Sequence, residues 1–333
     1  MPRNATNHLL QKAKKSKSDE FYTQLSDIVC ELQHYTHHFK GKTVYCNCDD
    51  PKTSNFFRYF TANFHALGLK KLVASCYREP AMDLFHADDC EHGYYCEYMG
   101  EADKDGNPEP ADIVYFQGTG DFRSAESIEL LKQSDIIVAN PPFSLFMEYV
   151  SQLIKYDKKF LIIGNINAIT YKEIFELIQK DKVWLGVNLG RGISGFIVPD
   201  RYERYGTEIG TDSHGNTIIA TNNCLWLTNM ELSQRHKDIP LTKEYLGNED
   251  KYPKFDNCNG INVNKTQDIP KDYVGLMGVP ITFLHKYNPE QFEIIRFRKG
   301  DDGKDLTADG KSPYFRILVK NRRIQSGVAG AAV

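Results

Sequence analysis

The chain has 333 residues, of which 41% are hydrophobic and 26% are charged, and its formal net charge is −3. This composition supports one large hydrophobic core or two modest ones, and it excludes a polycation that binds nucleic acid through its overall charge. No apolar run approaches the roughly 18 residues of a membrane span, and no apolar signal segment follows the charged N-terminus. The eight Cys residues form no Cys-x-x-Cys pair, so we expect a soluble cytoplasmic protein with free thiols and no metal site.

Residues 1–17 form a basic arm that contains five cations and no acidic residue. Such an arm is usually a solvated, flexible end, and its functional alternative is contact with phosphate groups. The cations are Arg3, Lys12, Lys14, Lys15 and Lys17. A helix is predicted to follow, from Asp19 to about Phe39.

Short apolar strands then alternate with helices as far as residue 188. Strands are predicted at 43–48, 71–77, 113–116, 135–139, 159–163 and 182–187, and helices at 56–67, 124–132, 145–156 and 171–179. A hairpin strand is also predicted at 94–98 within a polar segment, and Ser54 or Asn55 is the expected N-cap of the helix at 56–67. This alternation predicts an α/β fold with a doubly wound, mostly parallel sheet, which we assign to a domain of residues 18–188.

The alternation stops at about residue 189. Gly, Asn, Asp, Tyr and Pro separate short apolar runs such as 224–227 and 281–284, and a helix is predicted near 289–297. We interpret residues 189–325 as an irregular α+β extension of the first domain. The small residues of 326–333 predict a flexible tail.

Polar turns follow three of the predicted strands, at the edge where open α/β sheets place their ligands. Asp49-Asp50-Pro51 follows the first strand, Gly118-Thr119-Gly120-Asp121-Phe122 follows the strand at 113–116, and Asn140-Pro141-Pro142-Phe143 follows the strand at 135–139. The two prolines of the last turn must end the strand and stiffen the loop. A Pro-terminated core strand is the simpler interpretation of this loop taken alone.

Asn-Pro-Pro-Phe after a buried strand resembles the catalytic motif of amino-methyltransferases, which methylate exocyclic amines of adenine or cytosine, or a glutamine amide. The resemblance implies that the side-chain oxygen of Asn140 and the carbonyl of Pro141 each accept one N–H of the amine. Two fixed acceptors favour the pyramidal amine of the transition state over the planar ground state. Pro142 stiffens the loop, and Phe143 would stack on the base.

The whole chain resembles the N6-adenine DNA methyltransferases of the EcoRI modification type. The segments that carry this resemblance include KAKKSKSDEFYTQ, YCNCDDP, NPPFSLF, IKYDKKFLII, GFIVP, NNCLWLTN, INVNKT and MGVPITFLHK. The resemblance implies S-adenosylmethionine as cofactor, double-stranded DNA as partner and GAATTC as the target hexamer. It also implies a restriction-modification system in which methylation protects DNA from a partner endonuclease. We expect a monomer that rotates the target adenine out of the duplex.

The family's cofactor residues can be carried over to matching positions. Phe21 and Tyr22 would pack on the cofactor, Asp121 would accept from its amino group, and Phe122 would lie against its adenine ring. Asp49, Asp50 and Pro51 match the acidic-Pro start of the family's first turn, but the glycines of that turn are absent. Glu79 is the candidate for the ribose hydroxyls. Phe196 would face Phe143 across the flipped base, although a buried strand aromatic is an equally good interpretation.

Residues 189–325 would form the target-recognition region, because base flipping requires a large DNA interface. The candidate DNA contacts are Lys12, Lys14, Lys15, Lys17, Arg191, Lys320 and Arg322. By default each is a solvated cation, and phosphate or base contact is the functional alternative. Two other functions stay open: an RNA or protein-glutamine amino-methyltransferase with the same loop, and a DNA-binding relative that has lost its cofactor along with the glycines.

Overall fold

The structure, a computed structural model, describes residues 22–78, 92–101, 112–189, 193–198, 208–211, 215, 217–219 and 223–324. The chain divides into two units. The N-terminal unit comprises Met1–Ile174 and Leu185–Met230, and the C-terminal unit comprises Phe175–Trp184 and Glu231–Val333. The functional division predicted between residues 188 and 189 stays a prediction.

An eight-stranded sheet, in the order β5-β4-β3-β2-β6-β7-β12-β8, forms the core of the N-terminal unit. The strands are β5 (Ile113–Tyr115), β4 (Tyr94–Tyr98), β3 (Lys71–Cys76), β2 (Thr43–Asn47), β6 (Ile136–Ala139), β7 (Lys159–Asn165), β12 (Cys224–Thr228) and β8 (Trp184–Leu189). The central strands β3, β2, β6 and β7 pair in parallel, whereas β4, β5 and β12 pair antiparallel to their neighbours. The predicted α/β fold with a mostly parallel sheet is therefore confirmed.

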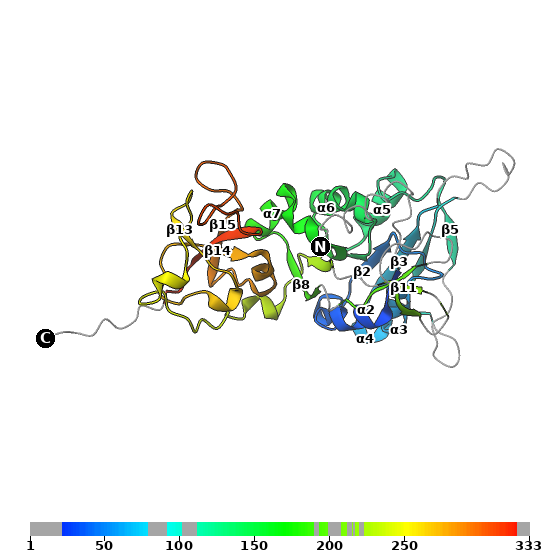
Figure 1. The fold of residues 1–333 in the computed structure, drawn as a ribbon. Helices are drawn as coiled ribbons and strands as arrows, with labels where there is room; N and C mark the ends of the chain where they lie inside the picture. The colour runs from blue at the N-terminus through cyan, green and yellow to red at the C-terminus, as the bar shows by residue number, and fades with distance from the viewer. Residues whose placement is uncertain are drawn as a thin grey trace. The chain divides into compact units, whose positions relative to one another are not determined.

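Helices cover both faces of this sheet, with α5 and α6 on one face and α2, α3 and α4 on the other (Figure 1). The helices are α2 (Leu25–Leu32), α3 (Asn55–Ala62), α4 (Phe64–Leu67), α5 (Ala125–Gln133), α6 (Phe146–Lys155) and α7 (Lys172–Gln179). Every residue of β2 and β6 is buried, as expected for strands with helices on both sides. The prediction of Ser54 as an N-cap is confirmed, because its side chain accepts from the backbone N–H groups of Phe56 and Phe57.

A second, antiparallel sheet of the N-terminal unit contains β1 (Tyr22–Thr23), β9 (Phe196–Val198), β11 (Thr217–Ile219) and β10 (Glu208–Thr211). The prediction of one helix from Asp19 to Phe39 is wrong for its first described residues, since Tyr22 and Thr23 pair with Ile197 and Phe196. Tyr and Thr favour strands when a partner strand is available. Here the partner comes from the other end of the unit, and α2 begins only after this pairing ends.

The sheet of the C-terminal unit has the order β13-β14-β16-β15. Its strands are β13 (Gly260–Asn262), β14 (Leu276–Pro280), β15 (Phe292–Phe297) and β16 (Arg316–Asn321). The helix predicted near 289–297 is wrong, because Phe292 and Ile294 alternate with less buried neighbours and pair with β16. The apolar run at 281–284 lies in a 3₁₀ helix, Ile281–Lys286, which follows Pro280.

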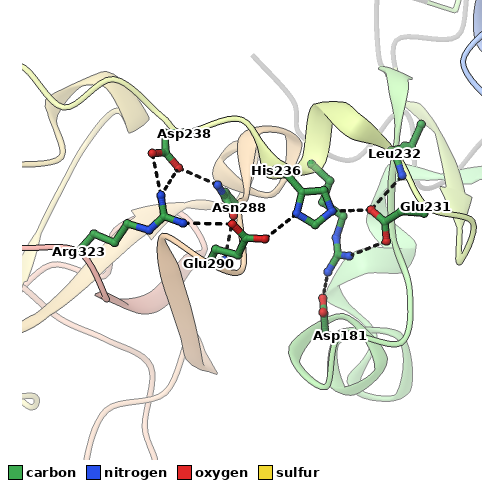
Figure 2. Close-up of polar contacts among 9 residues, drawn as sticks. Asp181, Glu231, Leu232, His236, Asp238, Asn288, Glu290 and Arg323 are labelled. Atoms are coloured by element: carbon green, nitrogen blue, oxygen red, sulfur yellow. Dashed lines mark hydrogen bonds and ion pairs between the residues drawn. The ribbon is translucent and has the colours of Figure 1, made fainter.

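A network of ion pairs and hydrogen bonds on the C-terminal unit is centred on His236 (Figure 2). One ring nitrogen of His236 lies 2.7 Å from Glu231 and the other lies 2.9 Å from Glu290. Glu290 also accepts from Arg323, which forms a further ion pair with Asp238. Because a carboxylate faces each ring nitrogen, hydrogen bonds to Glu231 and Glu290 raise the pKa of His236 above its ordinary value.

The stability of this unit is expected to depend on the charge of His236. A raised pKa means that the protonated ring is favoured in the folded protein. The protonated ring therefore makes its full contribution to the free energy of unfolding below about pH 6.5, the pKa of an unfolded histidine. It is lost as the pH rises through the higher pKa of the folded state. Between about pH 6 and about pH 9 the free energy of unfolding of the wild type should fall by up to about 1 kcal/mol more than that of His236→Gln. This value is the scale of exposed ion pairs. Denaturant midpoints measure this difference.

Exposed His34 in the N-terminal unit offers a matched control, since His34→Gln removes a histidine that lies outside the network. Its pH profile should follow that of the wild type. Parallel profiles for the wild type and His236→Gln would contradict the proposed contribution of the network.

Candidate active site

The Asn-Pro-Pro-Phe loop extends from the end of β6, whose neighbours are β2 and β7. Pro141 is buried, and Asn140 and Phe143 are partly buried. The chain turns at Pro142, whose carbonyl accepts from the N–H of Leu145 at 2.9 Å, and a 3₁₀ turn, Phe143–Leu145, leads directly into α6. The loop is therefore held between a buried strand and a helix at the carboxyl edge of the parallel strands, as the sequence predicted.

The rings of Phe143 and Phe196 lie together, with centroids 6.1 Å apart and planes inclined by 64°. Phe196 is 1% exposed and stands on β9, directly opposite Thr23 of β1. The structure thus brings together two aromatic residues that the sequence paired as walls for a flipped base. A base stacked between two rings needs about 3.5 Å on each side, roughly 7 Å in total. Its entry therefore requires one ring to turn or move.

The turn after β2, which is the first of the three predicted polar turns, is built without glycine. Cys48 has a φ of 61°, the left-handed conformation that glycine adopts most readily. The N–H of Asp49 donates to the carbonyl of Ser75 at 3.0 Å, and its carboxylate accepts from the hydroxyl of Ser54 at 3.1 Å. Since Ser54 also caps α3, buried Asp49 ties the turn both to β3 and to the helix that follows.

Asp50 is surrounded by donors. Its carboxylate accepts from the hydroxyl of Tyr94 at 2.7 Å and from the N–H of Lys52 at 2.9 Å. The guanidinium of Arg78 lies 3.6 Å from the same carboxylate and donates to the Tyr94 hydroxyl at 3.2 Å. Burial and the bond to Asp50 raise the pKa of Tyr94. The sequence analysis missed Arg78 and Tyr94, although both lie at the ends of predicted strands.

The turn after β5 brings Asp121 and Phe122 to the same edge of the sheet as the turn after β2. The N–H of Arg78 donates to the carbonyl of Thr119 at 2.9 Å, which joins this turn to the end of β3. Asp121 accepts from the backbone and side chain of Arg123, and these contacts lower the pKa of Asp121. Buried Phe122 packs against the ring of Tyr149 at 5.1 Å. The turns after β2 and β5 therefore both contact the end of β3, as the fold predicts.

Two buried carboxylates on α2, which were not predicted as site residues, bind the end of β8 and Ser194, two residues before Phe196. Asp27 accepts from the N–H and hydroxyl of Ser194 at 3.0 and 2.8 Å. Glu31 accepts from the N–H groups of Val187 and Asn188, both at 2.8 Å. The two acids are four residues apart, so they share one helix face. Their burial in a helix at the start of the domain is invisible in the sequence alone.

Several predicted residues lie outside the described part of the chain. They are Phe21, Glu79, Arg191 and the arm cations Lys12, Lys14, Lys15 and Lys17, together with the tail at 326–333. For Tyr22 the structure describes the backbone pairing in β1. Lys320 is exposed on β16, and Arg322 follows that strand with its guanidinium 4.0 Å from Glu293.

Within the described residues, no group of three or more His, Cys, Asp or Glu side chains is arranged to hold a metal ion. No helix among them is long and apolar enough to cross a membrane.

Comparisons with known proteins agree with this geometry. The family described as adenine-specific methyltransferase EcoRI matches residues 9–322. The chain is 65% identical over 325 residues to Type II methyltransferase M.EcoRI of Escherichia coli, with 98% of this chain and 100% of that protein covered. It is 36% identical over 334 residues to Type II methyltransferase M.MpnI of Mycoplasma pneumoniae, covering 95% and 99% of the two chains. No solved structure matches it significantly. With a doubly wound sheet, an Asn-Pro-Pro-Phe loop on its central strand and these relatives, the chain belongs to the EcoRI family of adenine-specific methyltransferases.

Proposed function

We propose that the chain methylates the N6 amine of an adenine within GAATTC in double-stranded DNA, using S-adenosylmethionine. The observation that carries the proposal is the position of the Asn-Pro-Pro-Phe loop at the end of a buried central strand, with the ring of Phe196 beside that of Phe143. The methylated site would be protected from a partner endonuclease. We further propose that the enzyme acts as a monomer and without a metal ion.

The proposed chemistry depends on two acceptors. The side-chain oxygen of Asn140 and the carbonyl of Pro141 accept the two N–H groups of the adenine amine, which leaves its lone pair free to attack. Because the loop is rigid, these acceptors stabilise the pyramidal amine without reorganising during the reaction. The cofactor supplies a methyl group already activated on a sulfonium, so the residues need not provide a strong base. The proton of the methylated amine is finally released to solvent.

Asp121 fits a role as the acceptor for the amino group of the cofactor. Its lowered pKa keeps the side chain ionised at neutral pH. A carboxylate offers about four acceptor positions, and Arg123 occupies part of them through its backbone N–H, Nε and Nη2. One lone pair of Oδ2 stays available. Phe122 would pack on the adenine ring, and the turn of Asp49, Asp50 and Pro51 would lie near the methionine end. Phe21, Tyr22 and Glu79 complete the proposed site.

We propose that the basic arm with Lys12, Lys14, Lys15 and Lys17 contacts the DNA backbone. Arg191, Lys320 and Arg322 are further proposed contacts from the target-recognition region. Phosphate contacts position the protein on the duplex, whereas specificity requires contacts to base edges or sequence-dependent DNA shape.

The proposed function is tested by transfer of a tritiated methyl group to duplexes that differ only in the GAATTC hexamer. Label should enter the N6 position of adenine in the intact site, and the methylated duplex should resist the endonuclease that cleaves GAATTC. A scrambled duplex, a structured RNA and a glutamine-containing peptide serve as competing substrates. Preferential labelling of RNA or peptide would replace the proposed function by its alternative.

Replacement of Asp121 by alanine is expected to weaken S-adenosylmethionine binding by roughly tenfold to a hundredfold. The variant loses an ionised acceptor, and hydrogen bonds to charged groups contribute about 1.5–3 kcal/mol. Calorimetry of cofactor binding measures the change. Glu129→Ala on α5 removes the same charge from an exposed ion pair with Lys132, and its affinity should be unchanged. Equal affinities for both variants would place the amino-group site elsewhere.

Replacement of Phe143 by alanine is expected to weaken the flipped state, because stacking of a base on an aromatic ring contributes about 1–3 kcal/mol. Phe143→Tyr keeps the ring and should retain most activity. The measurement is the fluorescence of 2-aminopurine at the target position, which rises when the base leaves the stack. An unchanged fluorescence response and turnover in Phe143→Ala would show that the ring only packs in the core.

A further inference from the structure

Arg316, the first residue of β16, differs from the other arginines in the described part of the C-terminal unit. Five of the six have a carboxylate within 4.0 Å. These pairs are Arg235 with Asp181, Arg296 with Asp301, Arg298 with Asp305, Arg322 with Glu293, and Arg323 with Asp238. Among the described residues, no carboxylate is paired with Arg316, although it is only 8% exposed.

The guanidinium of Arg316 is held by neutral acceptors instead. Its Nε donates to the side-chain oxygen of Asn262 at 2.8 Å, and Nη2 donates to that of Asn264 at 3.2 Å. Nη1 donates to the backbone carbonyl of Tyr314. Burial lowers the pKa of Arg316, and no charged group offsets this effect. A guanidinium nevertheless stays protonated in proteins, so a full positive charge is oriented here without a counter-ion among the described residues.

The fold of the unit fixes this arrangement. Asn262 ends β13, which pairs with β14, and β14 pairs in turn with β16, where Pro280 lies opposite Arg316. Asn262 also donates from its side chain to the oxygen of Asn264 at 3.1 Å, which orients the second amide. The guanidinium is thus held by the last residue of β13, by the loop after β13 and by a backbone carbonyl just before β16.

The site has unused donors and lies at the surface. A guanidinium has five N–H groups, and the three contacts among the described residues leave one N–H on each terminal nitrogen for an external acceptor. Asn264 is exposed, and Tyr314 is 64% exposed. A purely structural role explains the three bonds but not the charge, since burying an unpaired ion is costly. An external anion would compensate for it.

We propose that Arg316 binds a backbone phosphate of the DNA, with Asn262 and Asn264 holding its guanidinium in place. The proposal rests on the proposed function, in which duplex DNA is the substrate. A phosphate is favoured over a guanine edge because it carries the negative charge that this site lacks, whereas the guanine edge is neutral. The contact therefore contributes to affinity for any sequence and positions the C-terminal unit on the duplex.

The test is a salt titration of DNA affinity, measured by fluorescence anisotropy with a GAATTC duplex and a scrambled duplex. Arg316→Gln should weaken binding to both duplexes by roughly tenfold or more and reduce the slope of log affinity against log salt by about 0.9. Arg316→Lys should keep most of the slope. Arg298→Gln is the matched control, because Arg298 is already paired with Asp305, and it should leave affinity and slope unchanged.

A second variant covers the case in which Arg316→Gln does not fold. Asn264→Asp is isosteric at an exposed position, keeps both hydrogen bonds and supplies the missing carboxylate. It should leave the melting temperature equal or higher and weaken DNA binding. Gln267→Glu, three residues further and also exposed, adds the same charge and should weaken binding less.

The outcomes separate this inference from the proposed function. Wild-type protein that neither binds nor methylates duplex DNA would overturn both. If the wild type methylates GAATTC while folded Arg316→Gln and Asn264→Asp keep its affinity and salt slope, the phosphate contact alone is overturned. A loss confined to the GAATTC duplex would also overturn it, in favour of a guanine contact.

Discussion

Replacement of Asn140 by alanine is expected to lower the rate of methyl transfer by roughly two orders of magnitude or more, the scale of losing one preorganised polar contact in a transition state. Alanine cannot accept an N–H of the amine. The pyramidal amine of the transition state therefore loses one of the two acceptors that stabilise it relative to the planar ground state. Since Asn140 lies after β6 and the turns proposed for the cofactor follow β2, β3 and β5, cofactor affinity should change little. Single-turnover labelling and calorimetry measure the two quantities separately.

Asn140→Asp is the informative companion of this variant. It keeps an oxygen acceptor and nearly the same shape, but it adds a charge that must be desolvated when the base enters. We expect its rate to lie between those of the wild type and Asn140→Ala. A near-normal single-turnover rate in the alanine variant would remove Asn140 from the proposed mechanism.

Replacement of Glu31 by alanine is expected to destabilise the N-terminal unit by about 3 kcal/mol or more. The side chain is fully buried and also accepts from the Tyr35 hydroxyl and the Asn188 amide at 2.9 Å each. Removing it leaves the buried Tyr35 hydroxyl and the partly buried N–H groups of Val187 and Asn188 without this acceptor, and an unsatisfied buried polar group costs about 1–3 kcal/mol. The space is tightly filled, because a Cβ on Gly186 would come within 2.4 Å of the carboxylate. Denaturant unfolding measures the loss.

Glu31→Gln provides the graded comparison. Its amide keeps one acceptor oxygen but turns an NH₂ group toward donors, so its stability should lie between those of the wild type and Glu31→Ala. Glu129→Ala, on the exposed face of α5, should unfold at the wild-type midpoint. An unchanged midpoint for Glu31→Ala would mean that the segment at 187–188 is held by something other than this carboxylate.

The sequence predicted those parts of the site that depend on local signals. The loop at Asn140 follows from an apolar strand and two prolines, and the cap at Ser54 follows from its place before an aromatic helix. The pairing of Tyr22 with Ile197 and the strand at Phe292–Phe297 were missed, because each depends on a partner distant in the sequence. The left-handed backbone conformation of Cys48 was missed as well, because cysteine has no preference for a positive φ.

The pairing of β1 with β9 also dictates when the site can be completed during synthesis. Gln24, next to β1, donates to Ser194, a residue 170 positions further along the chain. A ribosome must therefore translate all the parallel strands before Phe196 can pack beside the Asn-Pro-Pro-Phe loop. Contacts over such separations form late because long loops must close first. A nascent or truncated chain that ends before residue 196 would contain the Asn-Pro-Pro-Phe loop but would lack the ring that packs beside Phe143.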